Sequence, residues 1–137
     1  MRKNGELIIS LALLHAKLLK RVDNQLSLHG ISFSEFMVLY NLNSAPQMTM
    51  RRIDLAENIG LSASGVTRLL NPMEKIKLVQ KELNPRDARV SLVKLSGAGE
   101  QILKDAMVGF NQIADLILKP LNSKQIADLS ELTKILL

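Results

Sequence analysis

Residues 61–96, LSASGVTRLLNPMEKIKLVQKELNPRDARVSLVKLS, decide the fold of this chain because a helical pattern passes directly into two strand patterns. Apolar side chains recur at steps of three and four residues in the first part, which predicts a helix with one buried face. These side chains are Val66, Leu69, Leu70 and Met73. Residues 78–83 and 90–95 predict two short strands, and residues 84–89, NPRDAR, form a basic turn between them. The stretch therefore predicts a helix followed by a basic β-hairpin.

A shorter helix is predicted immediately upstream, at residues 52–59. Gly60 ends this helix, and Ser62 caps the next one, since a serine hydroxyl accepts a hydrogen bond from an otherwise unpaired helical amide. Residues 48–50 predict a short third strand. Two helices joined by a tight turn and followed by a basic hairpin are the layout of a winged helix-turn-helix. We therefore predict a mostly α-helical fold with a small β wing.

Long amphipathic helices are predicted on both sides of this section, at residues 5–28, 97–119 and 123–136. The apolar stripe of the first helix is broader than contact with one core requires, which predicts that part of it faces another subunit. A chain of 137 residues has the length of one domain. We therefore assign residues 30–96 to the winged helix-turn-helix, and the flanking residues 1–29 and 97–137 to dimerisation helices.

Two further features concern the helices of the winged section. Ser32 and Glu35 have the spacing of a capping box, which predicts the start of another helix. Pro72 lies inside the predicted recognition helix, where it removes an amide hydrogen bond to Arg68. We expect this proline to kink the helix or to end its first segment.

Composition narrows the classes of function. The chain has no cysteine, which excludes disulfides and cysteine-based metal or redox sites. His15 and His29 are its only histidines, and the sequence offers neither a carboxylate cluster nor a nucleophile with a base. We therefore expect no metal, no cofactor and no enzymatic activity. The sequence contains no uncharged apolar run of about 18 residues and no cleavable signal, so we expect no membrane span and a cytoplasmic location.

Positive charge is concentrated between residues 51 and 94. This section holds nine Lys and Arg against five Asp and Glu, within a chain of net charge +5. Such a concentration is typical of proteins that bind a polyanion, although scattered surface charges alone do not decide it. Each basic residue by itself is more often an ordinary surface charge. The candidate contacts to DNA phosphates are Arg51, Arg52, Lys75, Lys77 and Lys81.

The helix face opposite the apolar one carries small or forked polar side chains. Side chains of these types suit base edges and phosphate oxygens. Ser64, Thr67, Arg68 and Asn71 share this face, and with Ser62 they are the predicted contacts in the major groove of DNA. For Ser62 the role of helix cap is the favoured alternative. Arg68 can fork onto a guanine or hold a phosphate, and the sequence does not rank the two.

The predicted wing carries Arg86 and Arg89 around one acidic residue. A narrow minor groove attracts arginine through its strongly negative potential, so both are candidate DNA contacts. The alternative is an ion pair between Asp87 and Arg89 that shapes the turn. We expect Asp87 to be structural, because a carboxylate near phosphates is repelled, and Arg86 to be the freer side chain.

The chain resembles the MarR (multiple antibiotic resistance regulator) family of transcription factors from end to end. The matching segments are SFSEFMVL at 32–39, LAE at 55–57, LSASGVTRL at 61–69 and MEK at 73–75. The most specific match is Asp87-Ala88-Arg89 followed by Leu95-Ser96 and Gly99, which resembles the D-x-R motif of the wing and the L-T/S-x-x-G motif that starts the next helix. Each segment alone is a weak signal, but all of them in order at the right spacing are a strong one.

The resemblance implies a homodimer held by the terminal helices, with two winged helices bound to a pseudo-palindromic operator in double-stranded DNA, more often as a repressor than as an activator. It also implies a small anionic aromatic effector that binds between the dimer helices and the winged section and lowers operator affinity. His15, Lys17, Arg21 and Tyr40 are the candidate polar groups for that effector. The favoured alternatives are a packed interface histidine for His15 and a core position for Tyr40, with its hydroxyl satisfied locally.

Two positions depart from the family pattern. Ala88 stands where many relatives carry arginine, which predicts weaker wing contact or a shift of that contact to Arg86. Lys77 stands where glycine is common, and a positive φ there would cost about 1–2 kcal/mol. An alternative function is a winged-helix protein-interaction module without DNA binding. Arginines in both the recognition helix and the wing disfavour it, because such a module has no need for them.

Overall fold

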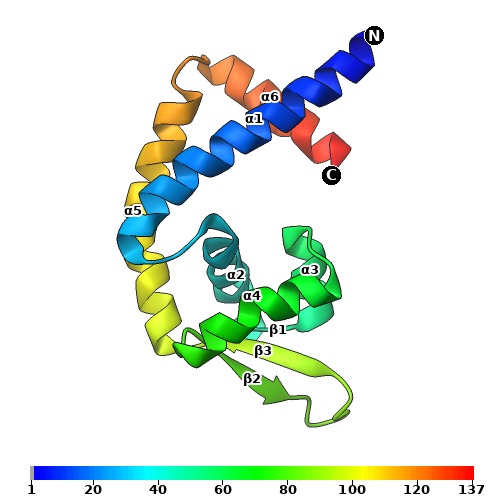
Figure 1. Ribbon diagram of the computed structural model, residues 1–137, viewed down its shortest axis with the longest axis vertical. Helices are drawn as coiled ribbons and strands as arrows, with labels where there is room; N and C mark the ends of the chain where they lie inside the picture. The colour runs from blue at the N-terminus through cyan, green and yellow to red at the C-terminus, as the bar shows by residue number, and fades with distance from the viewer. Residues whose placement is uncertain (1) are drawn as a thin grey trace.

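A three-stranded sheet with helices packed on it forms the lower part of the molecule, and long helices form the upper part, as Figure 1 shows for the computed structural model. The structure describes residues 2–137, so Met1 of the predicted N-terminal dimerisation segment lies outside it. The predicted mostly helical fold with a small β wing is confirmed. The elements are α1 (Lys3–Leu26), η1 (Ser27–His29), α2 (Phe33–Ser44), η2 (Pro46–Met48), β1 (Thr49–Arg51), α3 (Arg52–Ile59), α4 (Ala63–Lys75), β2 (Val79–Leu83), β3 (Ser91–Leu95), α5 (Gly97–Leu118) and α6 (Ser123–Leu136).

The sheet is antiparallel with strand order β1-β3-β2. In the wing hairpin Val79 pairs with Leu95 and Leu83 pairs with Ser91, so the chain turns back over residues 84–90. The short strand predicted at residues 48–50 is present one residue later and pairs with β3. The sheet therefore ties the start of α3 to the base of the wing.

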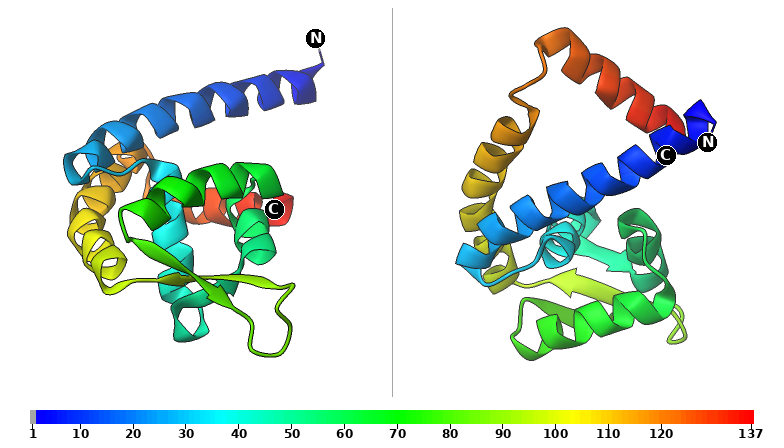
Figure 2. Two further views of the ribbon diagram at one scale, coloured as in Figure 1. Left: turned by 60° about the horizontal axis from the view of Figure 1, so that its bottom comes forward. Right: turned by 45° about the horizontal axis from the view of Figure 1, so that its top comes forward.

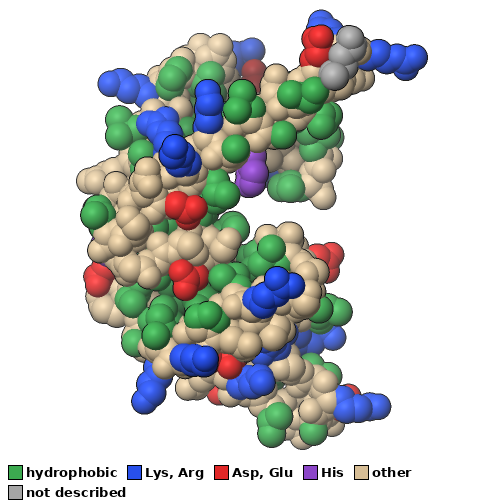
Figure 3. Space-filling view, in the orientation of Figure 1, with side chains coloured by type: hydrophobic (Ala, Val, Ile, Leu, Met, Phe, Trp, Pro, Cys, Tyr) green, Lys and Arg blue, Asp and Glu red, His purple; other side chains and the backbone are tan. Residues whose placement is uncertain are grey.

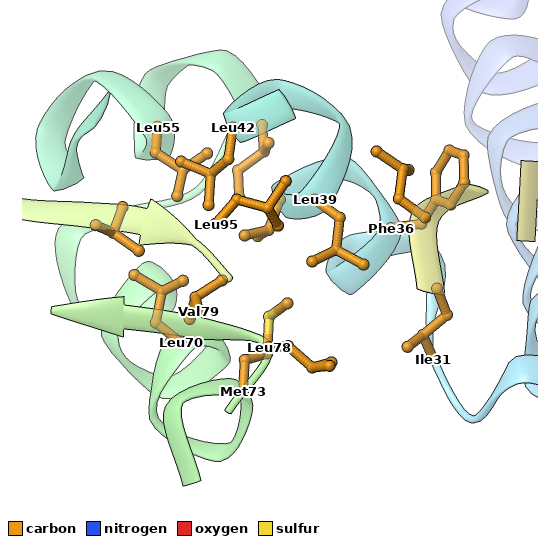
Figure 4. Close-up of a cluster of buried hydrophobic side chains, with 14 of the residues drawn as sticks. Ile31, Phe36, Leu39, Leu42, Leu55, Leu70, Met73, Leu78, Val79 and Leu95 are labelled. Carbon is orange, nitrogen blue, oxygen red and sulfur yellow. The ribbon is translucent and has the colours of Figure 1, made fainter. Parts of the chain in front are cut away.

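The main core lies between the sheet and the helices α2, α3 and α4. Figure 4 shows their aliphatic side chains pointing toward one another. Among them Leu39, Leu42, Leu55 and Leu70 are fully buried. The predicted apolar face of α4 is confirmed, because Val66 and Met73 are buried with Leu70, and its polar face is left to solvent.

The terminal helices are packed unequally. The last turn of α1 is buried through Val22 and Leu26, and Figure 2 shows the rest of α1 projecting away from the lower part. Every residue of α6 is exposed. Figure 3 shows hydrophobic side chains along this upper part. Within the described residues, none of the helices combines the length and hydropathy needed to cross a lipid bilayer.

Of the two effects expected of Pro72, the end of the helix was wrong, and a kink stays a prediction. α4 continues without interruption from Ala63 to Lys75. Pro72 and Arg68 are both exposed, so water can satisfy the Arg68 carbonyl that loses its amide partner. The cost of the missing bond is thereby reduced, and the helix extends for three more residues.

Candidate nucleic-acid interface

The turn between α3 and α4 is built from one glycine and one capping serine. Gly60 has a φ of +72°, a conformation that glycine adopts without strain. The Ser62 hydroxyl accepts a hydrogen bond from the Gly65 amide at 3.1 Å, so its favoured role as a cap is confirmed. It also lies 3.2 Å from the Ser64 hydroxyl. The capping geometry orients the first turn of α4, where the predicted contacts to base edges begin.

The predicted polar face of α4 is present as one exposed surface. Ser64, Thr67, Arg68 and Asn71 are all exposed. Among residues 2–137, no side chain forms an ion pair or hydrogen bond with the Arg68 guanidinium. Thr67 is engaged, because its hydroxyl donates to the Ala63 carbonyl at 3.1 Å and accepts from Arg52 at 3.3 Å. Arg68 is thus the unengaged cation of this face.

Two predicted phosphate contacts at the start of α3 are held in ion pairs. Arg51 donates from Nε to Asp54 Oδ2 at 2.9 Å, and these bonds raise the pKa of Arg51. The hydrogen bond from Arg51 likewise lowers the pKa of the Asp54 carboxyl. Arg52 reaches across to α4, where its Nη1 lies 3.4 Å from Glu74 Oε1. The two neighbouring arginines are therefore held by different elements.

The wing is shaped by two side chains that accept hydrogen bonds from the backbone. Asn84 Oδ1 accepts from the Arg86 amide at 2.9 Å, and Asp87 Oδ1 accepts from the Arg89 amide at 3.0 Å. Arg89 Nε also donates to Asp87 at 3.1 Å, so the predicted ion pair is confirmed. Its side-chain hydrogen bond, followed by its backbone one, lowers the pKa of the Asp87 carboxyl. Arg86 is exposed, and no other side chain among residues 2–137 pairs with its guanidinium.

A hollow of about 350 Å³ lies where α3, α4 and the wing meet. It brings together Arg51, Arg52, Thr67 and Arg89, which are far apart in the sequence. Lys77 and Lys81 line a different hollow, of about 400 Å³, beside Glu74. Figure 3 shows Lys and Arg side chains spread over this lower part of the molecule.

Comparison with known proteins shows which proteins this chain resembles. A model of the MarR family matches residues 29–90, from before α2 into the wing. A crystal structure of a mutant MarR from Escherichia coli, complexed with operator DNA, superimposes with a TM-score of 0.85 and 25% identity, and the match covers 100% of this chain and 99% of that one. The winged section of the chain matches the MarR family, and the whole chain shares the fold of that MarR structure.

Two curated relatives of this chain are transcriptional regulators. The repressor MprA of Escherichia coli strain K12 is 22% identical over 134 residues, which is 96% of this chain and 76% of that protein. The uncharacterised helix-turn-helix regulator YwaE of Bacillus subtilis is 26% identical over 87 residues, which is 64% of this chain. The match spans half the length of YwaE, 50%.

The geometry explains the MarR-like motif at the start of α5. The Ser96 hydroxyl accepts from the Gly99 amide at 3.0 Å and lies 2.7 Å from the Lys77 carbonyl and 2.8 Å from that of Leu78. A methyl group on Gly99 would collide with the Leu78 carbonyl oxygen. Lys77 has a φ of +63°, so the left-handed conformation expected from the family's glycine is present. The motif ties the end of α4 to the start of α5.

A separate hollow of about 510 Å³ lies among α2, α3 and α5. All four aromatic side chains of the chain line it, and the rings of Phe36 and Phe110 are stacked with centroids 4.5 Å apart. The favoured core position for Tyr40 was wrong: this side chain is 52% exposed, because it stands on the outward side of α2. The other aromatic lining residue is Phe33.

Of the four candidate effector residues, the structure brings only Tyr40 to this aromatic hollow. His15, Lys17 and Arg21 are exposed on α1 and do not line it. The polar groups that sequence reasoning missed are the amides of Asn41, Asn58 and Asn111. The sequence signal that could have pointed to this hollow was the scarcity of aromatic residues. In a chain with so few aromatic rings, their gathering around one hollow is informative.

Proposed function

We propose that this chain is a sequence-specific regulator of transcription that binds a pseudo-palindromic operator in double-stranded DNA as a homodimer and acts as a repressor. One observation carries the proposal: α4 presents Arg68 unengaged on an exposed polar face, next to a wing with two exposed arginines. An α-helix of this kind fits the major groove, and wing arginines suit a narrow minor groove. The operator DNA bound by the similar MarR structure and the repressor MprA support the proposal.

The charge distribution supports contact with phosphates. Residues 51–94 carry a net charge of +4, from nine basic and five acidic residues. A dimer that makes about six to ten phosphate contacts should lose affinity with salt, with a log–log slope of roughly −5 to −9. Slopes near zero would contradict the proposal. A regulator of this kind acts where the DNA is, which supports the cytoplasmic location expected from the sequence.

The exposed apolar faces of α1 and α6 support the homodimer. Leu132, Ile135 and Leu136 on α6 are exposed, as are Leu7 and Ile8 on α1. A helix of 14 residues in which every residue is exposed is marginal in water, so α6 needs a partner surface. A second copy supplies such a surface with the same composition and symmetry. Paired in this way, two recognition helices would bind half-sites about 34 Å apart.

The aromatic hollow supports regulation by a planar aromatic ligand. Its lining offers three amides and the Tyr40 hydroxyl but no Lys, Arg or His, which favours a neutral ligand over the anion expected from the resemblance. Calorimetric titration with benzamide and benzoate compares two ligands that differ chiefly in charge. We expect heat of binding from benzamide that is lost in Asn111→Leu. Tighter binding of benzoate would contradict the neutral assignment.

Binding measurements on a selected duplex test the central proposal. The wild-type chain enriches duplexes from a random pool, and affinity for the enriched sequence is compared with a scrambled duplex of the same composition. Arg68→Ala should weaken binding to the enriched duplex by about 1–3 kcal/mol, and Arg86→Ala should weaken it less. Lys104→Ala removes one charge from the exposed side of α5 and controls for net charge.

Two outcomes would contradict the proposed function. Equal binding by the wild type and the Arg68 and Arg86 variants would overturn the site assignment. A wild-type chain that binds no DNA would favour the alternative, a winged-helix protein-interaction module.

A further inference from the structure

Arg51 and Arg52 are adjacent in the sequence but lie in different environments. The side chain of Arg51 is 54% exposed and pairs with Asp54 within the first turn of α3. The side chain of Arg52 is 14% exposed and crosses from α3 to α4. Its two terminal nitrogens are divided between two partners on α4, Glu74 at 3.4 Å and Thr67 at 3.3 Å. Arg52 is therefore the polar connection between the two helices of the helix-turn-helix.

The hydrogen bond from Arg52 fixes the orientation of the Thr67 hydroxyl. This hydroxyl donates its hydrogen to the Ala63 carbonyl at 3.1 Å and accepts from Arg52 Nη2. A hydroxyl has one donor and two acceptor positions, so a single acceptor position and the methyl group remain for another partner. A free threonine could rotate about χ1, whereas Thr67 is held in one orientation from both sides.

The same connection neutralises the guanidinium. Glu74 is itself partly buried, with 23% of its side chain exposed. A phosphate that captured Arg52 would leave this carboxylate without its partner in a partly desolvated place, which is costly. Arg52 is thus poorly suited to be a phosphate contact, although its residue type and position predicted one.

We propose that Arg52 is a positioning residue for sequence recognition: it holds the Thr67 rotamer and the angle between α3 and α4 through Glu74, and it does not contact phosphate. This inference rests on the proposed DNA-binding function. Thr67 then presents its methyl group and one lone pair to the major groove. Such a surface suits a thymine methyl group or the amino group of adenine or cytosine.

The test separates discrimination from electrostatic attraction. Affinities for the enriched and scrambled duplexes are measured over a range of salt for the wild type, Arg52→Gln and Arg51→Gln. We expect Arg52→Gln to reduce the ratio of the two affinities about tenfold, the effect of one lost base contact, while the salt slope stays at the wild-type value. Arg51→Gln removes the same charge one residue earlier and should weaken binding to both duplexes by the same factor.

A double-mutant cycle tests whether Arg52 acts through Thr67. Thr67→Val removes the hydroxyl and keeps the shape, whereas Thr67→Ser keeps the hydroxyl. In the Thr67→Val background, Arg52→Gln should reduce the affinity ratio little further, because residues in one hydrogen-bond network are not additive. Thr67→Ser should retain the dependence on Arg52. Additive losses in the Thr67→Val background would overturn the proposal.

A second variant keeps the proposal testable if Arg52→Gln does not fold. Glu74→Ala frees the guanidinium while Arg52 remains, and thermal melting checks that the variant is folded. We expect a lower affinity ratio at an unchanged salt slope. A slope steeper by about 1.8, from one released arginine per subunit, would mean that Glu74 only holds Arg52 away from phosphate. A slope shallower by that amount in Arg52→Gln would likewise overturn the positioning role. If the wild-type chain enriches no sequence, the proposed function itself fails.

Discussion

The recognition helix α4 and the last helix α6 follow similar sequence patterns, but the apolar side of α4 is buried and that of α6 is exposed. They have 13 and 14 residues, and each begins at a polar cap, Ser62 for α4 and Asn122 for α6, whose side chain accepts a hydrogen bond from the third helical amide. The apolar face of α4 is buried in the core, and that of α6 is exposed along its length. The local sequence therefore specifies a helix in both cases without specifying what covers its apolar face.

This difference separates two equilibria, the folding of one chain and the association of two chains. Burial of the apolar face of α4 stabilises the fold of one chain at any protein concentration. Burial of the apolar face of α6 requires another molecule, so its contribution depends on concentration. Substitutions on the two helices should therefore be distinguishable by whether their effects change when the protein is diluted.

The largest effect is expected on α6. Leu132→Glu places a charge on the exposed apolar face of α6 and should convert the dimer into a monomer. The measured mass should fall from twice the chain mass to the chain mass of 15.2 kDa. Operator affinity should fall about 100-fold or more, because two linked half-sites no longer bind together. Light scattering and DNA titration measure the two changes. Ala127→Glu adds the same charge about 140° around the helix and serves as the matched control. A Leu132→Glu protein that stays a dimer would contradict the role of α6.

The next effect concerns α4. Leu70→Ala empties a fully buried position and should lower the free energy of unfolding by about 2–5 kcal/mol. Urea denaturation measures the loss, which should be the same at low and high protein concentration. Leu69→Ala, at a partly buried position on the same helix, should cost less. A loss that grows on dilution would show that the core of one chain is not self-sufficient.

A smaller effect of opposite sign is expected at the end of α4. Lys77 has a φ of +63°, so Lys77→Gly should relieve backbone strain. Glycine also adds entropy to the unfolded chain, which offsets part of this gain, so the net stabilisation of the fold should be about 1 kcal/mol. Lys77→Ala removes the same charge but keeps the strain, and should give no gain. Thermal melting of both variants is the measurement, and equal melting temperatures would contradict the strain argument.

The smallest effect is expected in the wing. The hydrogen bonds of the wing are exposed to water, in contrast to the buried side of α4. Bonds from Arg89 hold the pKa of the Asp87 carboxyl below its ordinary value. The charged carboxylate therefore stabilises the turn above about pH 4, and this stabilisation is lost as the pH falls through the lowered pKa. The NMR shift of the Arg89 amide should follow that titration, and Asp87→Asn should abolish it. An Asp87 that titrates at its ordinary value would contradict the ion pair.

Much of the candidate site was predictable because its signals are local. The cap at Ser62, the Asp87–Arg89 pair and the shared face of Arg68 and Asn71 depend on residues within two turns of helix or one hairpin. The helix end offered as one alternative at Pro72 was wrong, because the cost of the missing hydrogen bond depends on access of water to a carbonyl four residues earlier. Whether a helix surface is open to water is decided by the rest of the fold.

The tie from Arg52 to Thr67 and Glu74 lay beyond sequence reasoning for a similar reason. These residues are 15 and 22 positions apart, and no periodicity links them. The aromatic hollow likewise draws Phe33 and Phe110 together from α2 and α5. Such contacts require the angles between helices, which arise from packing around the whole core.

The sequence by itself determined the helices, their caps, the hairpin and the polar face of α4, because amphipathic periodicity and capping act over a few residues. Tertiary structure alone decided which apolar faces are covered and which cations are free. Burial and ion pairing depend on groups that the fold brings together from distant positions. For this reason α4 and α6 differ although their sequences follow the same rules, and Arg52 is held while Arg68 is free.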